Sequence, residues 1–162
     1  MTVCLVIGAC GVQPATQAPL VMGDGPDDEP VEVAALKAAY VHEGAGRSTV
    51  FVDIAGATDA EIEEIADRLS AELGVIVRHS DEALRDDPDL PALTPYDSKT
   101  GEVGVVLRLD DVTPTDSECY EVDVTYARSG LDGGSVSLTL VLESGEWVAQ
   151  GGEQTAIAKL IE

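Results

Sequence analysis

The sequence is poor in aromatic residues and in positive charge. Aromatic side chains make up 4% of its 162 residues, so a folded core has to consist mainly of Val, Leu, Ile and Ala. Lys and Arg number 9 against 31 Asp and Glu, a formal net charge of −22. Binding to nucleic acid or to anionic lipid depends on Lys and Arg that displace counterions. We therefore expect no nucleic-acid partner.

The excess of acids has two explanations that the sequence leaves open. Acids spread over the whole chain suggest adaptation to a saline medium, in which salt screens the repulsion between carboxylates. Alternatively, the charge only keeps the protein soluble. Apolar residues still make up 44% of the chain, which suits one globular domain and is too high for a disordered chain.

Cysteine and histidine are also scarce. Two of the three cysteines lie in the N-terminal apolar stretch, so Cys119 is alone in the body and the fold cannot depend on an internal disulfide. His42 and His79 are too isolated for a metal site. Although His79 is followed by Ser80 and Asp81, the members of a catalytic triad normally come from separate loops. We assign no catalytic residue and no cofactor, and the sequence indicates a non-enzymatic protein without excluding an enzyme.

The N-terminus carries the most specific motif of the chain. Residues 1–9 are apolar or small and uncharged, and Cys10 follows them. Ile7-Gly8-Ala9-Cys10 resembles the lipobox of bacterial lipoproteins, in which the cysteine receives diacylglycerol on its sulfur and becomes the mature N-terminus. The resemblance covers this segment alone. It implies that Cys10 is lipidated and that the protein is anchored at the cell envelope, facing outside the cytoplasm, with the membrane as partner.

Two features depart from the lipoprotein pattern. No basic residue precedes the apolar stretch, and the stretch is short for a signal peptide; a translation start upstream of Met1 would explain both. The alternative is a plain β-strand over residues 2–7. A dinucleotide-binding turn after it would need a G-x-G-x-x-G motif and a helix directly behind, and Pro14 and Pro19 disfavour that helix.

The composition divides the chain into three parts. After the signal-like segment 1–9, residues 10–29 combine the lipidated cysteine with a flexible, acidic tether rich in Pro and Gly, which has too little apolar surface to fold. Residues 30–162 are expected to form a single acidic domain.

This domain is predicted to be α+β. Apolar periodicity predicts a helix between Pro30 and Gly44, a strand over 48–54, a helix over 58–73 and a strand over 75–77. Thr58 and Glu61 have the spacing of a capping box, and Gly74 is a natural C-terminal cap. Four alternating strands then follow, at about 102–112, 118–128, 136–142 and from Trp147.

The predicted architecture is two amphipathic helices packed on a mainly antiparallel sheet. A β-α-β segment is followed by a four-stranded C-terminal meander, with one sheet face toward the core and the other toward water. The helices come first and the meander comes last, ending on Ser-Gly-Glu-Trp-Val at 144–148. This order resembles cone-shaped domains of the ketosteroid-isomerase-like kind, although the β-α-β segment departs from them. That resemblance implies a pocket between sheet and helices, lined by groups such as Tyr40, Tyr120, Tyr126 and Trp147.

The irregular segment 81–101 is the best place to look for function, because long loops on a scaffold tend to be kept for binding. Its candidate ligand or partner residues are Asp86, Asp87, Asp89 and Asp97. Their spacing does not follow the Asp-x-Asp-x-Asp-Gly calcium loop, so we assign no metal, although calcium binding stays open.

Two hypotheses for function follow. The first is a membrane-tethered lipoprotein domain that acts by binding or structural contact at the cell envelope, with an unknown protein or small-ligand partner. The second is a small pocket-bearing domain of the cone-like kind that binds or converts an apolar ligand. A cavity between helices and sheet distinguishes them, because only the second requires it.

Overall fold

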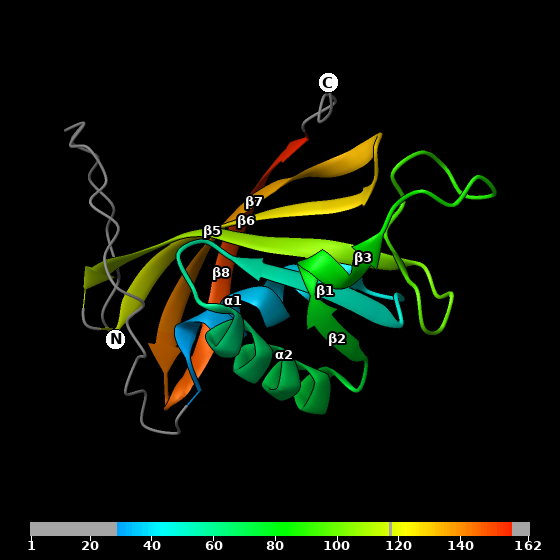
Figure 1. The fold of residues 1–162 in the computed structure, drawn as a ribbon. Coiled ribbons are helices and arrows are strands. Elements are labelled where there is room, and N and C mark those ends of the chain that lie inside the picture. Colours follow the sequence, from blue (N-terminus) through cyan, green and yellow to red (C-terminus); the bar gives the residue numbers. More distant parts are fainter. Residues whose placement is uncertain (1–28, 117, 157–162) are drawn as a thin grey trace.

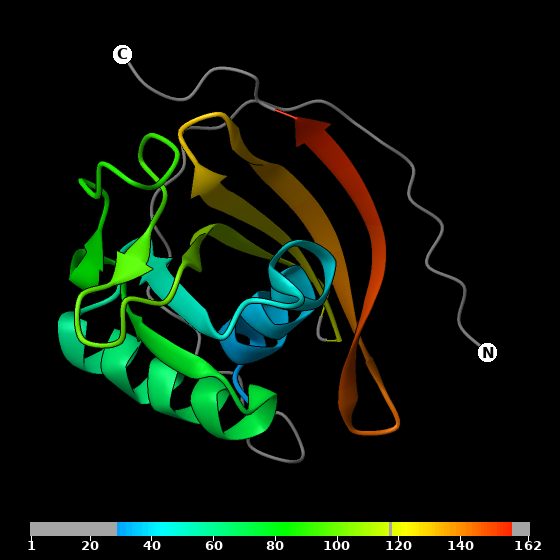
Figure 2. The same ribbon diagram turned by 90° about the vertical axis from the view of Figure 1, so that its right-hand side faces the viewer.

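The computed structural model describes residues 29–116 and 118–156. Its main sheet has six strands in the order β2-β1-β5-β6-β7-β8 and curls around helix α1 (Figures 1 and 2). Its strands are β1 (Thr49–Ile54), β2 (Ile76–His79), β5 (Gly104–Asp116), β6 (Cys119–Ser129), β7 (Asp132–Glu143) and β8 (Glu146–Ala156). The helices are α1 (Val31–Ala39), continued by a π-helical turn η1 (Tyr40–Gly44), and α2 (Asp59–Leu73). The predicted mixed α+β class is confirmed.

The sheet is mostly antiparallel. β1 runs parallel to both of its neighbours, β2 and β5, and the chain passes through α2 between β1 and β2. The strands from β5 to β8 pair antiparallel with their neighbours in chain order. A short helix η2 (Ser80–Glu82) and a small two-stranded sheet of β3 (Ala83–Leu84) and β4 (Tyr96–Asp97) lie between β2 and β5 in the chain.

Helix α2 begins and ends where the sequence predicts. The Thr58 hydroxyl accepts a hydrogen bond from the Glu61 N–H, and the Thr58 N–H donates to the Glu61 carboxylate at 2.7 Å. Gly74 ends the helix with φ 67°, a left-handed conformation that glycine adopts without steric cost. The apolar stripe of Ile62, Ile65 and Leu69 is buried. The capping-box prediction is confirmed.

Helix α1 differs from the predicted amphipathic helix. Residues 31–36 are all buried, so the helix has no broad polar face over these turns. The physical reason is the curl of the sheet, because α1 lies in its concave side and packs against β5 to β8 as well as α2 (Figure 2). The Trp147 indole N–H donates to the carbonyl of Glu29 at 3.2 Å, which ties the start of α1 to β8.

The outer face of the sheet, turned away from the helices, is only partly exposed to water. On β6 and β7 the predicted alternation holds, with one face in the core. On β1 and the first half of β5 it is wrong, because Phe51 is 0% and Val106 is 8% exposed on the outer face. Residues 80–103, which we call the cover segment, fold back over this part of the sheet and bury it (Figure 1).

Candidate functional site

The cover segment meets the outer face of the sheet in two different ways. Neighbouring strands place Arg78, Phe51, Val106, Ala127 and Gly133 in one lateral row across this face. Near Arg78 and Phe51 the cover segment is closed onto the sheet by buried polar contacts. Near Ala127 and Gly133 it leaves a pocket. We call these the closed end and the open end.

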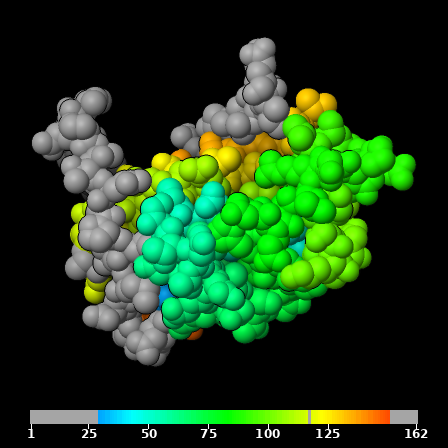
Figure 3. All heavy atoms as spheres, in the orientation of Figure 1, coloured from blue at the N-terminus to red at the C-terminus, as the bar shows by residue number. Residues whose placement is uncertain are grey.

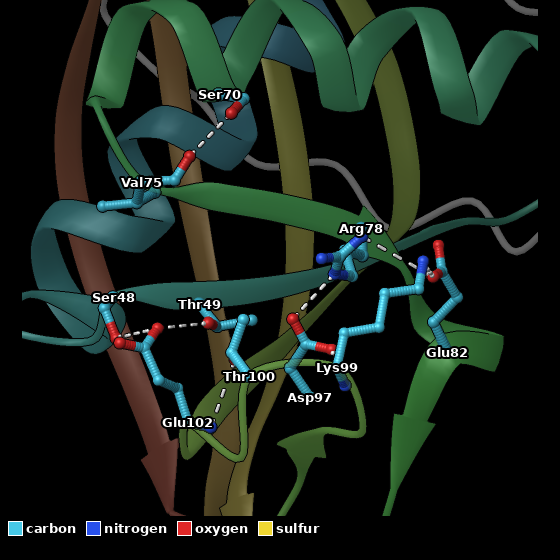
Figure 4. A network of polar contacts seen from close by, with 10 residues as sticks. All are labelled: Ser48, Thr49, Ser70, Val75, Arg78, Glu82, Asp97, Lys99, Thr100 and Glu102. Atoms are coloured by element: carbon cyan, nitrogen blue, oxygen red, sulfur yellow. Dashed lines mark hydrogen bonds and ion pairs between the residues drawn. The ribbon is translucent and has the colours of Figure 1, made fainter.

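The closed end is held by a buried ion pair. The Arg78 Nε donates to Oδ2 of Asp97 at 2.9 Å, and the Lys99 N–H donates to Oδ1 at 2.8 Å (Figure 4). The Asp97 side chain is only 2% exposed. Burial by itself raises the pKa of Asp97, but the Lys99 N–H and the Arg78 guanidinium outweigh it and hold the pKa below its usual 3.8. Asp97 is therefore an ionised, fully partnered anchor.

A second contact fixes the far end of the cover segment to β1. The hydroxyls of Ser48 and Thr49 donate to the same carboxylate oxygen of Glu102, at 2.9 and 3.3 Å (Figure 4). Glu82, at the near end of the segment, accepts from the Lys99 ammonium at 3.1 Å. These contacts join parts of the chain that are far apart in sequence, and they hold the segment in one position.

The open end contains a pocket with a volume of about 170 Å³. It lies between the cover segment and the β6–β7 hairpin, which stand side by side at the upper right of Figure 3. Apolar lining comes from Val106 and Ala127, paired on the outer face, and from Leu93 and Leu131. Leu131, at the hairpin tip, is 96% exposed. The remaining lining residues are Arg85, Arg108, Thr125, Tyr126, Ser129, Gly130 and Gly133.

Both charged residues of the pocket are arginines. Arg108 forms ion pairs with Asp110 at 3.0 Å and with Asp53 at 3.8 Å, both measured to Nε, and its terminal nitrogens donate no hydrogen bond within residues 29–116 and 118–156. Arg85 forms no hydrogen bond or ion pair with any residue in the described part of the chain. In contrast to the guanidinium of Arg78, neither of these two groups donates a hydrogen bond to a described residue.

Local backbone features hold the wall of the pocket. Leu93 has φ 60°, a left-handed conformation that costs a residue with a side chain about 1–2 kcal/mol. The Gly130 N–H donates to the Ala92 carbonyl at 2.8 Å and joins the hairpin to the cover segment. A Cβ at position 130 would lie 3.0 Å from that carbonyl and 3.2 Å from the Leu93 side chain. Glycine therefore suits this close approach, because a larger residue would displace its neighbours by a few tenths of an ångström.

The four predicted aspartates do not converge on one site. Asp86 accepts a hydrogen bond from the Tyr96 hydroxyl at 2.9 Å, and Asp87 accepts one from the Asp89 N–H at 2.9 Å. Asp97 is the anchor of the closed end. Among the described residues no group of three or more His, Cys, Asp or Glu is placed to hold a metal ion.

The pocket instead uses two other residues of the predicted loop, Arg85 and Leu93. Sequence reasoning missed Arg85 because acids outnumber cations so strongly in this segment. The useful signal was the cation itself, since a lone Arg among Asp residues in a long loop has no obvious structural partner. The role of Leu93 depends on its backbone angle, for which the sequence has no signal.

The space between helices and sheet is filled by the hydrophobic core. Side chains of α1, α2 and the inner sheet face pack there in one cluster that includes Tyr120 and Tyr126. Tyr120 meets Trp147 edge to face with ring centroids 5.5 Å apart, and the Tyr40 hydroxyl donates to the Arg47 carbonyl. The inner pocket of the second hypothesis therefore has no observation in its favour, and of these four aromatic residues Tyr126 also lines the outer pocket.

The remaining residues singled out from the sequence have structural roles or lie outside the described residues. The His79 Nδ1 accepts from the Asp81 N–H at 3.1 Å and caps η2. Cys119 is buried in β6, an interior strand. Cys10 and the segments 1–9 and 10–28 lie outside the described residues, so the lipobox stays a prediction.

Within the described part of the chain no helix is long and apolar enough to cross a membrane. No family model, no curated protein and no solved structure matches the chain. Any functional interpretation therefore has to rest on the residues themselves.

Proposed function

We propose that this chain is a non-enzymatic binding domain, anchored at the cell envelope by a lipid on Cys10 and facing outside the cytoplasm. The observation that carries the proposal is the pocket of about 170 Å³ at the open end. It is held by a strained Leu93 and by a close contact at Gly130, where a Cβ would lie 3.0 Å from the Ala92 carbonyl. Backbone strain of this kind persists where the surroundings enforce it, and it is concentrated at binding sites.

The composition of the pocket favours binding over catalysis. Its described lining offers the hydroxyls of Ser129 and Thr125 as nucleophiles but no Asp, Glu, His or Cys, so it lacks the general base that usually activates such a hydroxyl. Apolar walls with a few polar groups are typical of ligand sites.

For the topology of the fold, we infer a β-α-β segment from β1 through α2 to β2, followed by a meander from β5 to β8. In this arrangement the β6–β7 hairpin is free to form one pocket wall.

The position of the pocket is compatible with a tether at the N-terminus. Helix α1 begins at Val31, directly after the predicted tether 10–29. The start of α1 and the β6–β7 hairpin, whose tip lines the pocket, lie far apart on the domain in both views (Figures 1 and 2). A lipid anchor joined to the chain before Val31 would therefore leave the pocket accessible.

The anchor is tested by the intact mass of the protein recovered from membranes after expression from an upstream start. We expect a chain that begins at Cys10 and carries a diacylglyceryl adduct. A Cys10→Ser variant serves as the control and should lose both the adduct and the membrane association. An unmodified chain that retains Met1 and stays out of the membrane fraction would overturn the anchor.

A further inference from the structure

We infer that the open-end pocket binds a small organic anion, a carboxylate on a short apolar chain, with Arg85 and Arg108 as the groups that recognise the carboxylate. The inference rests on the proposed binding function and names the ligand class of the same site. It does not depend on the lipid anchor.

The charge of the molecule makes the two arginines informative. A chain with a net charge of −22 repels anions, so an anion site on it needs a local concentration of positive charge. Arg85 and Arg108 come from different elements, the cover segment and β5, and meet at one pocket. The arginine guanidinium matches the two oxygens of a carboxylate with parallel hydrogen bonds.

Among the described residues, acids form ion pairs with Arg108 but not with Arg85. Asp110 is the close partner of Arg108, and the Thr125 hydroxyl holds Asp110 by donating to its other oxygen at 2.5 Å. The distances to Asp110 and Asp53 are measured to Nε, and the terminal nitrogens of Arg108 donate no hydrogen bond to the described residues. Asp86, next to Arg85 in sequence, accepts from Tyr96.

Size and apolar lining limit the rest of the ligand. The cavity is more than ten times the roughly 10–15 Å³ that one water needs, yet smaller than the roughly 300–1,000 Å³ of sites for drug-sized molecules. Leu93, Val106 and Ala127 offer an apolar surface. Leu131 at the rim is exposed to solvent, and a bound hydrocarbon chain would cover it. A ligand that combines a carboxylate with a short hydrocarbon chain satisfies both the charged and the apolar groups.

The test compares three probes on the full 162-residue chain, with binding followed by calorimetry and by amide NMR shifts. Sodium hexanoate carries both features, 1-hexanol has the chain without the charge, and sodium acetate has the charge with almost no chain. We expect hexanoate to bind about tenfold tighter than either, because only hexanoate uses both the arginines and the apolar lining. The largest shifts should come from residues 85–93 and 129–133.

Matched variants separate the pocket arginines from the general charge. Arg85→Gln and Arg108→Gln should each weaken hexanoate binding by about tenfold, the loss of one charge-assisted contact. Arg47→Gln is the control, because Arg47 lies outside the pocket and its side chain has no ion pair with the described residues. Thermal melts verify that each variant folds, and Leu131→Ser should weaken hexanoate but not acetate.

Each contrary outcome has a defined meaning. If 1-hexanol binds as tightly as hexanoate, or if Arg47→Gln weakens hexanoate as much as Arg85→Gln does, the anion inference is overturned while the pocket remains a binding site. If no probe shifts the amides that line the pocket, the anion inference is overturned as well. In either case the adduct on Cys10 is measured separately, so failure of the ligand class and failure of the anchor are distinguishable.

Discussion

The two ends of the cover segment use the same residue type in opposite ways. At the closed end, Arg78 donates to a carboxylate that is 2% exposed, and Phe51 beside it is completely buried. At the open end, Arg85 has no ion pair or hydrogen bond in the part of the chain that the structure describes, and Arg108 is ion-paired only through exposed carboxylate contacts, without a hydrogen bond from its terminal nitrogens. The difference teaches that an arginine in the sequence does not by itself indicate a binding site. Whether its guanidinium is hydrogen-bonded to a buried carboxylate distinguishes a structural arginine from one that can bind a ligand.

The closed end also supports the open end. Removing one member of a buried ion pair is costly, because the other charge is left without compensation. A segment anchored in this way at Asp97 and at Glu102 can keep its other part, residues 85–93, away from the sheet without collapsing onto it. Arginines that remain in contact with water pay little desolvation free energy. The contacts of the closed end can therefore hold the segment in place while the open end contributes little to stability.

The largest effect should come from breaking the anchor. Asp97→Ala removes the hydrogen-bonded carboxylate of Arg78, which keeps only Glu82 at 3.8 Å, and it leaves the Lys99 N–H without its acceptor. We expect the free energy of unfolding to fall by about 3 kcal/mol, measured by urea denaturation. Ser98→Ala, an exposed change in the same turn, is the control. A loss below about 1 kcal/mol would show that the closed end is no anchor and would break the comparison.

The same anchor predicts a loss of stability in acid. Because the pKa of Asp97 is lowered in the folded state, its contribution is fully present above the usual value of 3.8 and is lost as the pH falls through the folded pKa. The difference in unfolding free energy between the wild type and Asp97→Asn should therefore be constant near neutral pH and shrink below about pH 4. A constant difference down to pH 2 would contradict this assignment.

The elements of the fold that depend on neighbours in sequence could be predicted, whereas the site could not. Thr58, Glu61 and Gly74 define α2 because capping involves residues within one turn of each other. Phe51 alternates with inward residues, a position typical of the water-facing side of a sheet, but the cover segment, later in the chain, buries it. The residues around Phe51 carry no signal that a later segment of the chain covers it.

The pocket shows the same limit more sharply. It depends on the contact between Ala92 and Gly130, which are distant in sequence, and on the backbone angle of Leu93. In sequence, Asp97 resembles Asp89, yet only Asp97 meets an arginine. Irregularity and length single out the 81–101 segment, two of whose residues line the pocket, but which of its charges is neutralised depends on three-dimensional contacts.

A buried charge of a third kind lies in helix α1. Glu32 is buried there and forms no ion pair with any described residue. One oxygen of its carboxylate has no hydrogen-bond partner in the described structure. Burial raises the pKa of Glu32, a hydrogen bond with its own backbone opposes this, and the Glu61 carboxylate adds to the rise. Glu32→Leu should raise the free energy of unfolding at pH 7 by about 1–2 kcal/mol, because it removes an uncompensated buried group.

The sign of the pH dependence makes this prediction specific. A raised pKa means that the folded protein releases the proton of Glu32 later than the unfolded chain does, so stability falls as the pH rises above the usual value of 4.5. The gain from Glu32→Leu should therefore be larger at pH 7 than at pH 4. Glu63→Leu, an exposed position on α2, controls for the lost charge and should show no such trend.

The smallest effect on stability should accompany a clear loss of binding, at Leu93. Asparagine tolerates the left-handed conformation better than leucine, so Leu93→Asn relieves strain while it removes a half-buried apolar side chain. These terms oppose each other, and we expect stability within about 0.5 kcal/mol of the wild type. Hexanoate affinity should nevertheless drop several-fold, as calorimetry measures, because the variant loses an apolar wall of the pocket.

The outcome separates two roles for this strained residue. Unchanged stability with weakened binding would mean that the strain at Leu93 serves the ligand rather than the fold, as the contrast between the two ends implies. A destabilisation above about 2 kcal/mol would instead make Leu93 a packing residue, and the open end would then be structural like the closed one. Thr94→Ala, which removes the hydroxyl that donates to the Pro91 carbonyl in the same turn, shows how much of any loss comes from the turn itself.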